Sequence, residues 1–386
     1  MTQPDRTPRK DKLLFTPGPL TTSAGVKQAM LRDVGSRDDE FVAVIKDIRH
    51  RLVRLANVDE TEEGGGYTAV LMQGSGTFGI ESVISSTVAP EGKLLVIVNG
   101  AYGQRMARIA ATLGIRTVKL CCPEDEAPDV ELVEQTLAGD PDITDVAVVH
   151  CETTSGILNP IRQIGWRAKQ HGCNTIVDAM SSFGGVPIDA RQCSIDYLVS
   201  SSNKCVESVP GFSFVIARKT ALEKCQLLSR SLSLDLYAQW REFESSGQFR
   251  FTPPTHALLA FHRALLELEE EGGVPGRAER YKRSHRALLD GMRALGFLEY
   301  LPPDHQSTII TSFHYPDHPN FDFASFYRRL SERGFVIYPG KVSRAECFRI
   351  GTIGRIDEQD VRDLVAAIGL TLIDMGATPQ EQGQYS

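Results

Sequence analysis

Short apolar runs alternate with helical segments between residues 67 and 219 of the chain. Seven runs predict strands, at 69–73, 94–99, 117–121, 146–151, 175–178, 197–200 and 212–217. Several are continuously apolar, which is typical of strands covered on both faces. Helical patterns separate them, most clearly at 79–88, 103–113 and 161–170. Because this order favours right-handed parallel crossovers, the sequence predicts an α/β fold with a mostly parallel central sheet.

The pattern changes at residues 269–273, where a helical stretch ends in three glutamates and two glycines. Beyond it the predicted elements are a helix at 277–295, a strand at 308–313, a helix with one apolar face at 323–330, strands at 335–338 and 347–350, and a helix at 361–368. The sequence therefore predicts an N-terminal arm at 1–25, a large domain at 26–273 and a smaller α+β domain at 274–386. We expect the polar tail at 377–386 to fray.

Composition and charge exclude several classes of protein. The chain has 386 residues, of which 41% are hydrophobic and 24% charged, so it is neither disordered nor fibrous. Its net charge of −7 argues against nucleic acid as the main partner, since proteins that bind the nucleic-acid backbone usually carry an excess of basic residues. No run approaches the roughly 18 apolar residues of a membrane span, and we see no secretory signal. We therefore expect no nucleic-acid partner, no membrane span and a cytoplasmic location.

Eight cysteines are distributed without the spacing of a disulfide framework or a CxxC pair. In a chain of this length they are most simply reduced thiols, as in the cytoplasm. Zinc at the adjacent Cys121 and Cys122 is a weaker alternative, because no second pair of ligands follows nearby. We predict no metal site.

Residues 74–79 read GSGTFG, after a predicted strand and at the start of a helix. Glycines allow the backbone to approach an anion, and the helix N-terminus adds free N–H groups and the positive end of its dipole. The motif also matches the dinucleotide fingerprint, which requires an acidic residue about 20 positions later. Here the next strand is followed by Asn99, Gly100 and Ala101. The turn therefore predicts a phosphate site, and an NAD-dependent oxidoreductase or a structural turn are the weaker alternatives.

Two ionisable residues follow later strands. Asp178 ends one strand, where open α/β sheets bind ligands, and a helix N-cap or a solvated loop residue is the weaker alternative. Lys204 follows the next strand among small hydroxyl residues, where a lysine loses its proton easily and attacks carbonyls. Taken alone, it is more simply a solvated charge. The spacing of 26 residues leaves room for one strand between them.

The glycine turn, Asp178 and Lys204 together match the needs of pyridoxal phosphate. The lysine amine bonds to the cofactor aldehyde, the carboxylate keeps the pyridine nitrogen protonated, and the glycine turn holds the phosphate. Parallel strands bring all three to one edge of the sheet. A non-catalytic protein would have no evident use for both ionisable groups.

Eight segments carry a resemblance to a known family, at 15–20, 74–79, 99–105, 151–156, 177–185, 202–212, 251–256 and 348–354. In these segments and their order the chain resembles the class V aminotransferases of fold type I. The resemblance implies a pyridoxal phosphate-dependent transferase with Lys204 and Asp178 as catalytic residues. It also implies a homodimer in which Thr252 reaches the neighbouring subunit's cofactor, and it makes Arg349 the residue that binds the substrate's acid group.

The resemblance further assigns cofactor contacts to several side chains. They are Ser75, Gly76, Thr77 and Asn203 at the phosphate, Tyr102 and Met180 on the ring faces, and Thr153 or Thr154 at the ring hydroxyl.

Within the class, residues 178–185 and the surroundings of Lys204 resemble the phosphonate-using branch. This implies 2-aminoethylphosphonate as amino donor and pyruvate as acceptor, with alanine–glyoxylate or serine–pyruvate transfer as the alternative. Two positions depart from the branch: Arg37 replaces a usual aromatic residue, and Glu207–Ser208 replace a glutamine–glycine type pair. Arg37 either binds the dianionic phosphonate or indicates a carboxylate-only substrate. Cysteine desulfurases share the fold, but Cys347 directly precedes a predicted strand, a poor place for a mobile nucleophile.

Overall fold

A seven-stranded sheet forms the centre of the computed structural model, which describes residues 11–61 and 65–377. In spatial order its strands are β2 (Tyr67–Gln73), β10 (Phe212–Arg218), β9 (Tyr197–Ser201), β8 (Asn174–Asp178), β5 (Ile143–Val149), β3 (Lys93–Val98) and β4 (Arg116–Cys121). Every pairing from β9 to β4 is parallel. The prediction of an α/β fold with a mostly parallel sheet is confirmed.

Strand β10 is antiparallel to both of its neighbours, β2 and β9. The reason is the connection: only residues 202–211 separate β9 from β10, and they contain no helix. A parallel pair needs a crossover of a dozen or more residues, whereas a short loop returns the chain antiparallel. That loop contains Lys204, and we call residues 202–211 the lysine loop.

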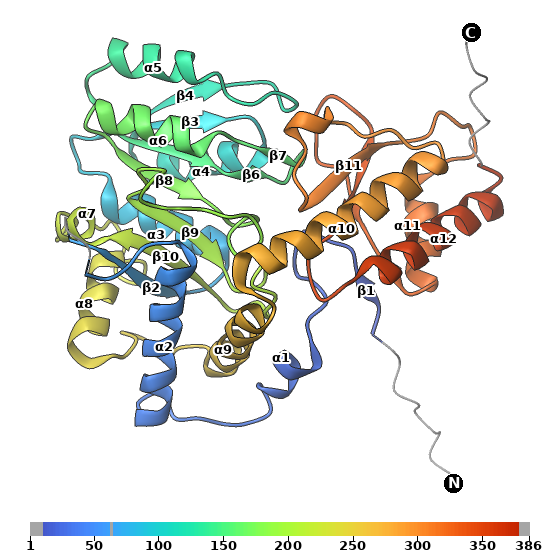
Figure 1. Cartoon of the computed structure of the whole chain (residues 1–386). Helices are drawn as coiled ribbons and strands as arrows, with labels where there is room; N and C mark the ends of the chain where they lie inside the picture. Colours follow the sequence, from blue (N-terminus) through green and yellow to red (C-terminus); the bar gives the residue numbers. More distant parts are fainter. Residues whose placement is uncertain (1–10, 62–64, 378–386) are drawn as a thin grey trace.

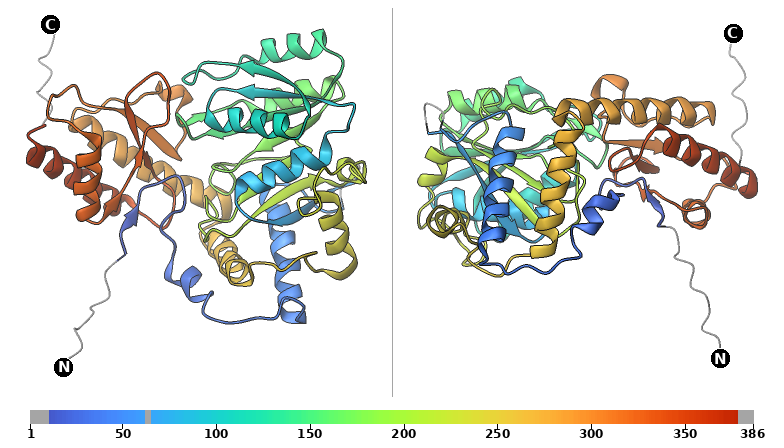
Figure 2. Two further views of the ribbon diagram at one scale, coloured as in Figure 1. Left: turned by 180° about the vertical axis from the view of Figure 1, so that it is seen from behind. Right: turned by 60° about the horizontal axis from the view of Figure 1, so that its bottom comes forward.

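Helices cover both faces of the sheet (Figures 1 and 2). Helices α3 (Gly76–Thr87) and α4 (Ala101–Thr112) lie on the face seen from behind in Figure 2, and α2 (Asp39–Leu55) and α6 (Ile161–Gln170) lie on the other. The remaining helices of this part are α1 (Ala24–Gln28), α5 (Val130–Gly139), α7 (Lys219–Glu223), α8 (Leu236–Ser246) and α9 (Thr255–Glu270).

Burial of the strands explains their continuous apolar runs. From Leu94 to Val98, every residue of β3 is buried, as is every residue of β5 except Thr144. Burying one aliphatic side chain contributes about 1.5–3 kcal/mol, so a strand covered on both faces is stabilised at each position. The predicted strand at 146–151 is divided, because β6 (Cys151–Glu152) leaves the sheet to pair with β7 (Ile157–Leu158).

A second hydrophobic core lies in the C-terminal part. Helix α10 (Gly273–Ala294) runs from the sheet into this part (Figure 1). Strands β11 (Ile310–His314), β14 (Cys347–Gly351) and β13 (Tyr338–Pro339) form an antiparallel sheet, with helices η1 (Pro303–His305), α11 (Phe323–Glu332) and α12 (Glu358–Met375) around it.

The N-terminal segment belongs to the second core. Strand β1 (Leu13–Leu14) pairs in parallel with β12 (Phe335–Val336), and Phe15 is buried among the C-terminal residues. The predicted strand at 335–338 is therefore split between two pairings. The domain boundaries at 25/26 and 273/274 stay predictions.

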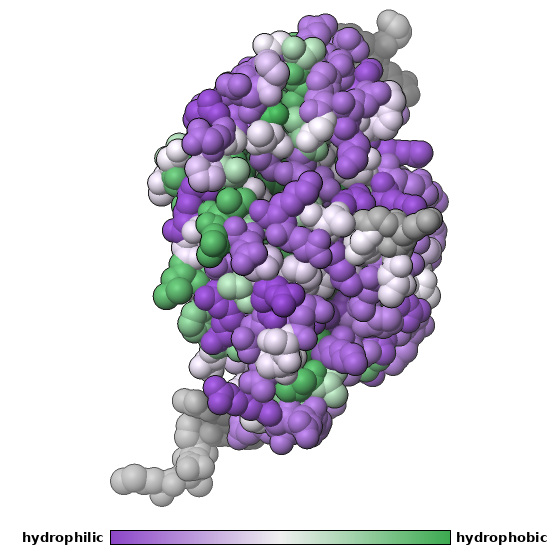
Figure 3. Space-filling view, turned by 90° about the vertical axis from the view of Figure 1, so that its left-hand side faces the viewer, coloured by the Kyte–Doolittle hydropathy of each residue, from purple (hydrophilic) through white to green (hydrophobic). Residues whose placement is uncertain are grey.

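The surface opposite the C-terminal part is mostly hydrophilic, with small scattered apolar patches (Figure 3). None of the helices that the structure describes is long and apolar enough to cross a bilayer. The expected fraying of the polar tail concerns residues 378–386, which lie outside the described part of the chain, as do the first ten residues of the predicted arm.

Candidate active site

A cavity of about 190 Å³ lies where the central strands end. Eight of the predicted site residues line it together: Ser75, Gly76, Thr77, Tyr102, Asp178, Met180, Asn203 and Lys204. Their segments are far apart in the sequence, and parallel strands bring them together because their carboxyl ends share one edge.

The glycine turn joins β2 to α3 at one end of the cavity. Gly74 has a φ of 102°, a left-handed conformation that glycine adopts without strain. A Cβ on Gly76 would lie 2.2 Å from the sulfur of Met180, so a side chain there would displace Met180, one of the residues that line the cavity. Ser75 is the N-cap of α3 and forms no side-chain cap. Within the described residues the N–H groups of Gly76 and Thr77 have no acceptor, which leaves them free for an anion.

Asp178 is the last residue of β8 and is only 5% exposed. One carboxylate oxygen accepts a hydrogen bond from the Met180 N–H at 2.9 Å. Burial raises the pKa of Asp178 to about 6. In the described part of the chain no cation forms an ion pair with this carboxylate, so the site favours a ligand that brings a positive charge.

The side chain of Lys204 enters the cavity from the lysine loop. Its Nζ donates a hydrogen bond to the Pro17 carbonyl at 2.6 Å, so the N-terminal segment lies directly against it. Burial lowers the pKa of Lys204. Across residues 11–61 and 65–377, no carboxylate pairs with this amine. A desolvated, unpaired amine is a good nucleophile toward a carbonyl group.

Two cations beside Tyr102 were not among the predicted site residues. Arg105 donates to the Thr77 hydroxyl at 3.1 Å, and its guanidinium lies 4.9 Å from the centre of the Tyr102 ring. Lys341 approaches the same ring to 4.3 Å. Helical spacing would have indicated Arg105, because residues three apart share a helix face. Lys341 comes from a loop of the C-terminal part, and no local pattern marks it.

A buried carboxylate, Glu152, positions Tyr102. It accepts hydrogen bonds from the N–H groups of Tyr102 and Gly103, at 3.1 and 3.2 Å, at the start of α4. It also accepts the Thr154 hydroxyl at 2.6 Å, and that hydroxyl accepts the Ala101 N–H at 2.9 Å. Because the Thr154 hydroxyl is used in this way, Thr153 is the better candidate of the two for contact with a ring hydroxyl.

Arg349 reaches the site from β14 in the C-terminal part and is 5% exposed. Its Nε donates to the Pro339 carbonyl at 3.0 Å and its Nη1 to the Thr153 carbonyl at 2.7 Å. Burial lowers its pKa, although a guanidinium stays charged at neutral pH. Arg349 is not among the residues that line the cavity, but its charge acts on the pKa values of Tyr102 and Lys204, so a cation from the C-terminal part lies beside the cavity.

Five predicted residues are not among those that line this cavity: Thr153, Thr154 and Arg349, described above, and Thr252 and Arg37. The last two lie elsewhere on the surface. Both are exposed and line a separate surface cavity of about 330 Å³. The carbonyls of Phe251 and Thr252 accept hydrogen bonds from the Gln73 side chain, at 2.9 and 3.2 Å, which ties this segment to the strand before the glycine turn.

The cysteines give no support to the alternatives based on thiol chemistry. All eight are free, and Cys347 is buried at the start of β14, where burial raises its pKa to about 11. A protonated thiol in a strand is a poor mobile nucleophile. The described residues contain no group of three or more potential metal ligands, at Cys121 and Cys122 or elsewhere.

Three parts of the site fit three groups of pyridoxal phosphate: its phosphate, its ring nitrogen and its aldehyde. The start of α3, with Arg105 close by, suits a dianionic phosphate. The buried carboxylate of Asp178 suits a protonated ring nitrogen, and the Lys204 amine suits the aldehyde. Tyr102 and Met180 line the same cavity as these groups.

Comparison with known proteins agrees with this chemistry. The family model described as Aminotransferase class-V matches residues 22–344. The chain is 53% identical over 362 residues to 2-aminoethylphosphonate–pyruvate transaminase of Vibrio vulnificus (strain YJ016), which covers 93% of this chain and 97% of that one. It is 54% identical over 361 residues to the protein of the same name from Syntrophobacter fumaroxidans, covering 93% and 96%.

A solved structure of alanine–glyoxylate aminotransferase from Nostoc sp. matches the fold with a TM-score of 0.86 at 26% identity, covering 96% of this chain and 97% of that one. Together these findings confirm a pyridoxal phosphate-dependent aminotransferase. The chain belongs to the class V aminotransferase family.

Proposed function

We propose that this chain transfers the amino group of 2-aminoethylphosphonate to pyruvate, giving phosphonoacetaldehyde and alanine. The names of relatives that share more than half of its residues support this choice of substrates. One structural observation carries it: a buried guanidinium, Arg349, and a buried amine, Lys204, reach one site from different elements. Such a pair suits a substrate with an acid group at one end and an amine at the other.

Several residues of the chain would hold the cofactor. The α3 N-terminus, Ser75, Thr77 and Asn203 bind the phosphate, and Asp178 faces the ring nitrogen. When bound, pyridoxal phosphate withdraws electrons from the bonds of the carbon that carries the substrate nitrogen. Asp178 keeps the ring nitrogen protonated through a buried ion pair.

Lys204 has two roles in the proposal. Its amine holds the cofactor while no substrate is present. After a substrate amine takes that place, Nζ would remove a proton from the substrate carbon and deliver it to the cofactor carbon bonded to the nitrogen, and it would move a proton in the opposite direction in the second half of the reaction. The lowered pKa of Lys204, caused by burial, supports this role because the amine spends more time unprotonated than an exposed lysine.

Arg349 binds the acid group in both halves of the reaction. Its planar guanidinium forms two parallel hydrogen bonds with a carboxylate or a phosphonate. The bonds to Pro339 and Thr153 fix its orientation before the substrate arrives. The same residue therefore accepts phosphonate from the donor and carboxylate from pyruvate.

A second copy of the chain would complete the site. Phe78 and Phe251, next to the glycine turn and to Thr252, are 52% and 45% exposed. Contact with a partner would bury these rings and bring Thr252 to the partner's cofactor phosphate, with Arg37 beside it. Analytical ultracentrifugation tests the dimer, and a mass near 42.5 kDa, that of a single chain, contradicts it.

We propose the cytoplasm as the location of the protein. Its eight free cysteines support a reducing compartment. Cell fractionation tests this, and recovery from an oxidising compartment contradicts it.

The experiment that tests the function is an amino-donor screen with the purified holoenzyme. Donors are 2-aminoethylphosphonate and serine with pyruvate, measured as alanine, and alanine with glyoxylate, measured as glycine. We expect turnover with 2-aminoethylphosphonate to exceed the others. We also expect Arg349→Ala to lower its kcat/KM by a factor that corresponds to about 1.5–3 kcal/mol of lost binding. Faster turnover of serine, or of alanine with glyoxylate, contradicts the proposal and favours the alternative branches.

A further inference from the structure

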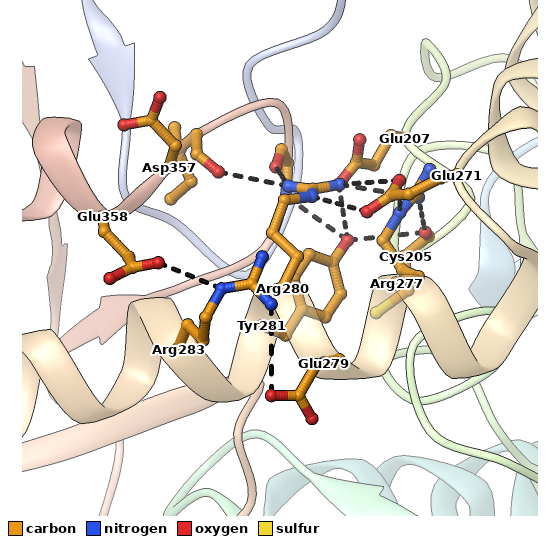
Figure 4. Close-up of polar contacts among 12 residues, drawn as sticks. Cys205, Glu207, Glu271, Arg277, Glu279, Arg280, Tyr281, Arg283, Asp357 and Glu358 are labelled. Atoms are coloured by element: carbon orange, nitrogen blue, oxygen red, sulfur yellow. Dashed lines mark hydrogen bonds and ion pairs between the residues drawn. The ribbon is translucent and has the colours of Figure 1, made fainter.

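Next to the lysine loop lies a group of buried and partly buried charges that the site described above does not use (Figure 4). We call Glu207, Glu271, Arg277, Arg280 and Tyr281 the α10 cluster. Arg277 and Arg280 pair with Glu271 at 2.6 and 2.7 Å. Glu207 pairs with Arg280 at 2.8 Å, accepts the Tyr281 hydroxyl at 2.7 Å and lies 3.5 Å from Arg277. Two carboxylates and two guanidinium groups thus balance in charge.

Glu207 is held in an unusual conformation. It is 5% exposed, and its φ of 65° lies in the left-handed region, which is costly for a residue with a side chain. Such strain persists only where the surroundings fix the residue, and it concentrates at functional sites. Here the surroundings are the two arginines and Tyr281.

The α10 cluster holds the backbone next to Lys204. The Glu207 N–H donates to the Lys204 carbonyl at 2.7 Å, which closes the turn. Arg277 donates to the Cys205 carbonyl at 2.6 Å. The α10 cluster therefore holds in place the residues that directly follow Lys204 in the sequence.

The same cluster also reaches the segment that follows Arg349. Arg280 donates to the carbonyls of Gly354 and Ile356, at 2.7 and 3.1 Å. Gly354 lies three residues after the end of β14, the strand that carries Arg349. The Arg280 guanidinium thus connects the lysine loop, through Glu207, with the segment that follows Arg349.

We propose that Glu207 is a positioning residue that sets the spacing between the Lys204 amine and the Arg349 guanidinium, and thereby the length of substrate that the enzyme accepts. The proposal rests on the proposed function, in which the two ends of one substrate meet these two groups. Glu207 touches neither substrate nor cofactor and acts through Arg280 and through the lysine loop.

The chemistry of the side chain predicts a graded effect. Glu207→Gln keeps an oxygen that accepts from Arg280 and Tyr281 but loses the charge, which leaves one buried positive charge in excess. Glu207→Leu removes the acceptor as well and frees the lysine loop from α10. A pocket discriminates a substrate by about 10-fold or more per methylene, and this discrimination requires a fixed spacing.

The test compares 2-aminoethylphosphonate with its longer homologue 3-aminopropylphosphonate, with pyruvate as acceptor. The variants are Glu207→Gln and Glu207→Leu, with Glu358→Gln as matched control. Glu358, the first residue of α12, pairs with Arg283 of α10 at 3.0 Å, but the pair is about half exposed and does not contact the lysine loop. We expect the ratio of the two kcat/KM values to fall about 10-fold in Glu207→Leu, less in Glu207→Gln, and not at all in the control.

A second readout does not depend on turnover. Cofactor-free protein is mixed with pyridoxal phosphate, reduced with borohydride at set times, and the adduct at Lys204 is measured by mass spectrometry. We expect slower adduct formation in Glu207→Leu, because its lysine loop is no longer held, and an unchanged rate in Glu358→Gln. If Glu207→Leu does not fold, Arg280→Lys replaces it, since an ammonium group cannot reach Glu207, Glu271 and both carbonyls together.

The outcomes separate the two proposals. A wild type without turnover of 2-aminoethylphosphonate contradicts the proposed function and this inference with it. An active wild type and folded variants that keep both its length preference and its rate of adduct formation contradict the inference alone.

Discussion

Lys204 and Glu207 are three residues apart in one loop, and their charges are in opposite situations. The Lys204 amine faces the cavity, where its hydrogen-bond partner is the Pro17 carbonyl and no carboxylate of the described chain pairs with it. The Glu207 carboxylate faces away from the cavity and is held by Arg280 and Tyr281. A buried charge is thus unpaired in the cavity and paired in the α10 cluster.

The pKa shifts of the two regions run in opposite directions. In the cavity, burial raises the pKa of Asp178 to about 6 and lowers that of Lys204, so both groups approach neutrality. In the α10 cluster burial also opposes charge, but the arginines outweigh it and lower the pKa of Glu271, and the carboxylates raise the pKa of Arg280. Unpaired buried charges are available to a ligand, whereas paired ones fix the backbone.

Replacing Lys204 should have the largest effect on activity and a small effect on the fold. Lys204→Met removes the group that bonds to the cofactor and transfers protons, so transamination should fall by on the order of 10³-fold or more. The cofactor-free variant should keep its stability within about 1 kcal/mol, because the amine it loses is buried and has no ion-pair partner. Alanine formation and urea unfolding measure the two effects. Full activity in Lys204→Met would overturn the assignment of the site.

Replacing Arg277 should have the reverse effect. Arg277 is 1% exposed and bonds to Glu271 and to the Cys205 carbonyl, so Arg277→Met leaves the carboxylates of Glu207 and Glu271 with a single guanidinium, that of Arg280, and one negative charge in excess. We expect a loss of about 3–5 kcal/mol in the free energy of unfolding, measured with urea. Arg283→Met is the control: its ion pairs are half exposed, and its loss should not exceed about 1 kcal/mol. Equal losses of unfolding free energy in the two variants would contradict the claim that the ion pairs of the α10 cluster stabilise the fold more than exposed ion pairs do.

Local sequence patterns predicted the sheet and the cavity because both depend on features that are local in sequence. Several strands are continuous apolar runs, and the glycine turn, Asp178 and Lys204 each lie at or just after the end of a predicted strand. The order of strands along a parallel sheet then brings their ends together. The same reasoning missed the antiparallel direction of β10, since it took no account of the short lysine loop.

Contacts between distant segments lay beyond this reasoning. Arg280 meets Glu207 only because α10 crosses from the sheet into the C-terminal part, and Lys341 meets Tyr102 across the same junction. No spacing along the chain encodes either contact. Glu207 stood out in the sequence as a departure from a family pattern, but its partners became visible only in the fold.

The smallest expected effect concerns Asp178. It is the pH dependence of the folding stability of the cofactor-free protein. The pKa of Asp178 is raised from 3.8 to about 6, so between these pH values the folded protein binds a proton that the unfolded chain releases. Stability should therefore fall as pH rises through this window, by up to about 3 kcal/mol. Asp178→Asn carries no charge and should lose this pH dependence. It should be more stable than wild type at pH 8 and similar to it at pH 4.

Asp196 is the matched control, because it is equally buried but paired. It is 4% exposed, bonds to Arg218 at 3.0 Å and accepts the Thr175 N–H at 3.0 Å. Asp196→Asn leaves Arg218 without its partner and should destabilise the protein at pH 8, the opposite sign to Asp178→Asn. Thermal unfolding at pH 4, 6 and 8 measures both variants. Saturating pyridoxal phosphate should reverse the order of wild type and Asp178→Asn at pH 8, because a protonated ring nitrogen supplies the cation that the buried carboxylate lacks. An Asp178→Asn variant that is no more stable than wild type in the cofactor-free protein at pH 8 would show that the Asp178 carboxylate is not an unpaired buried charge. The difference between the cavity and the α10 cluster would then not hold.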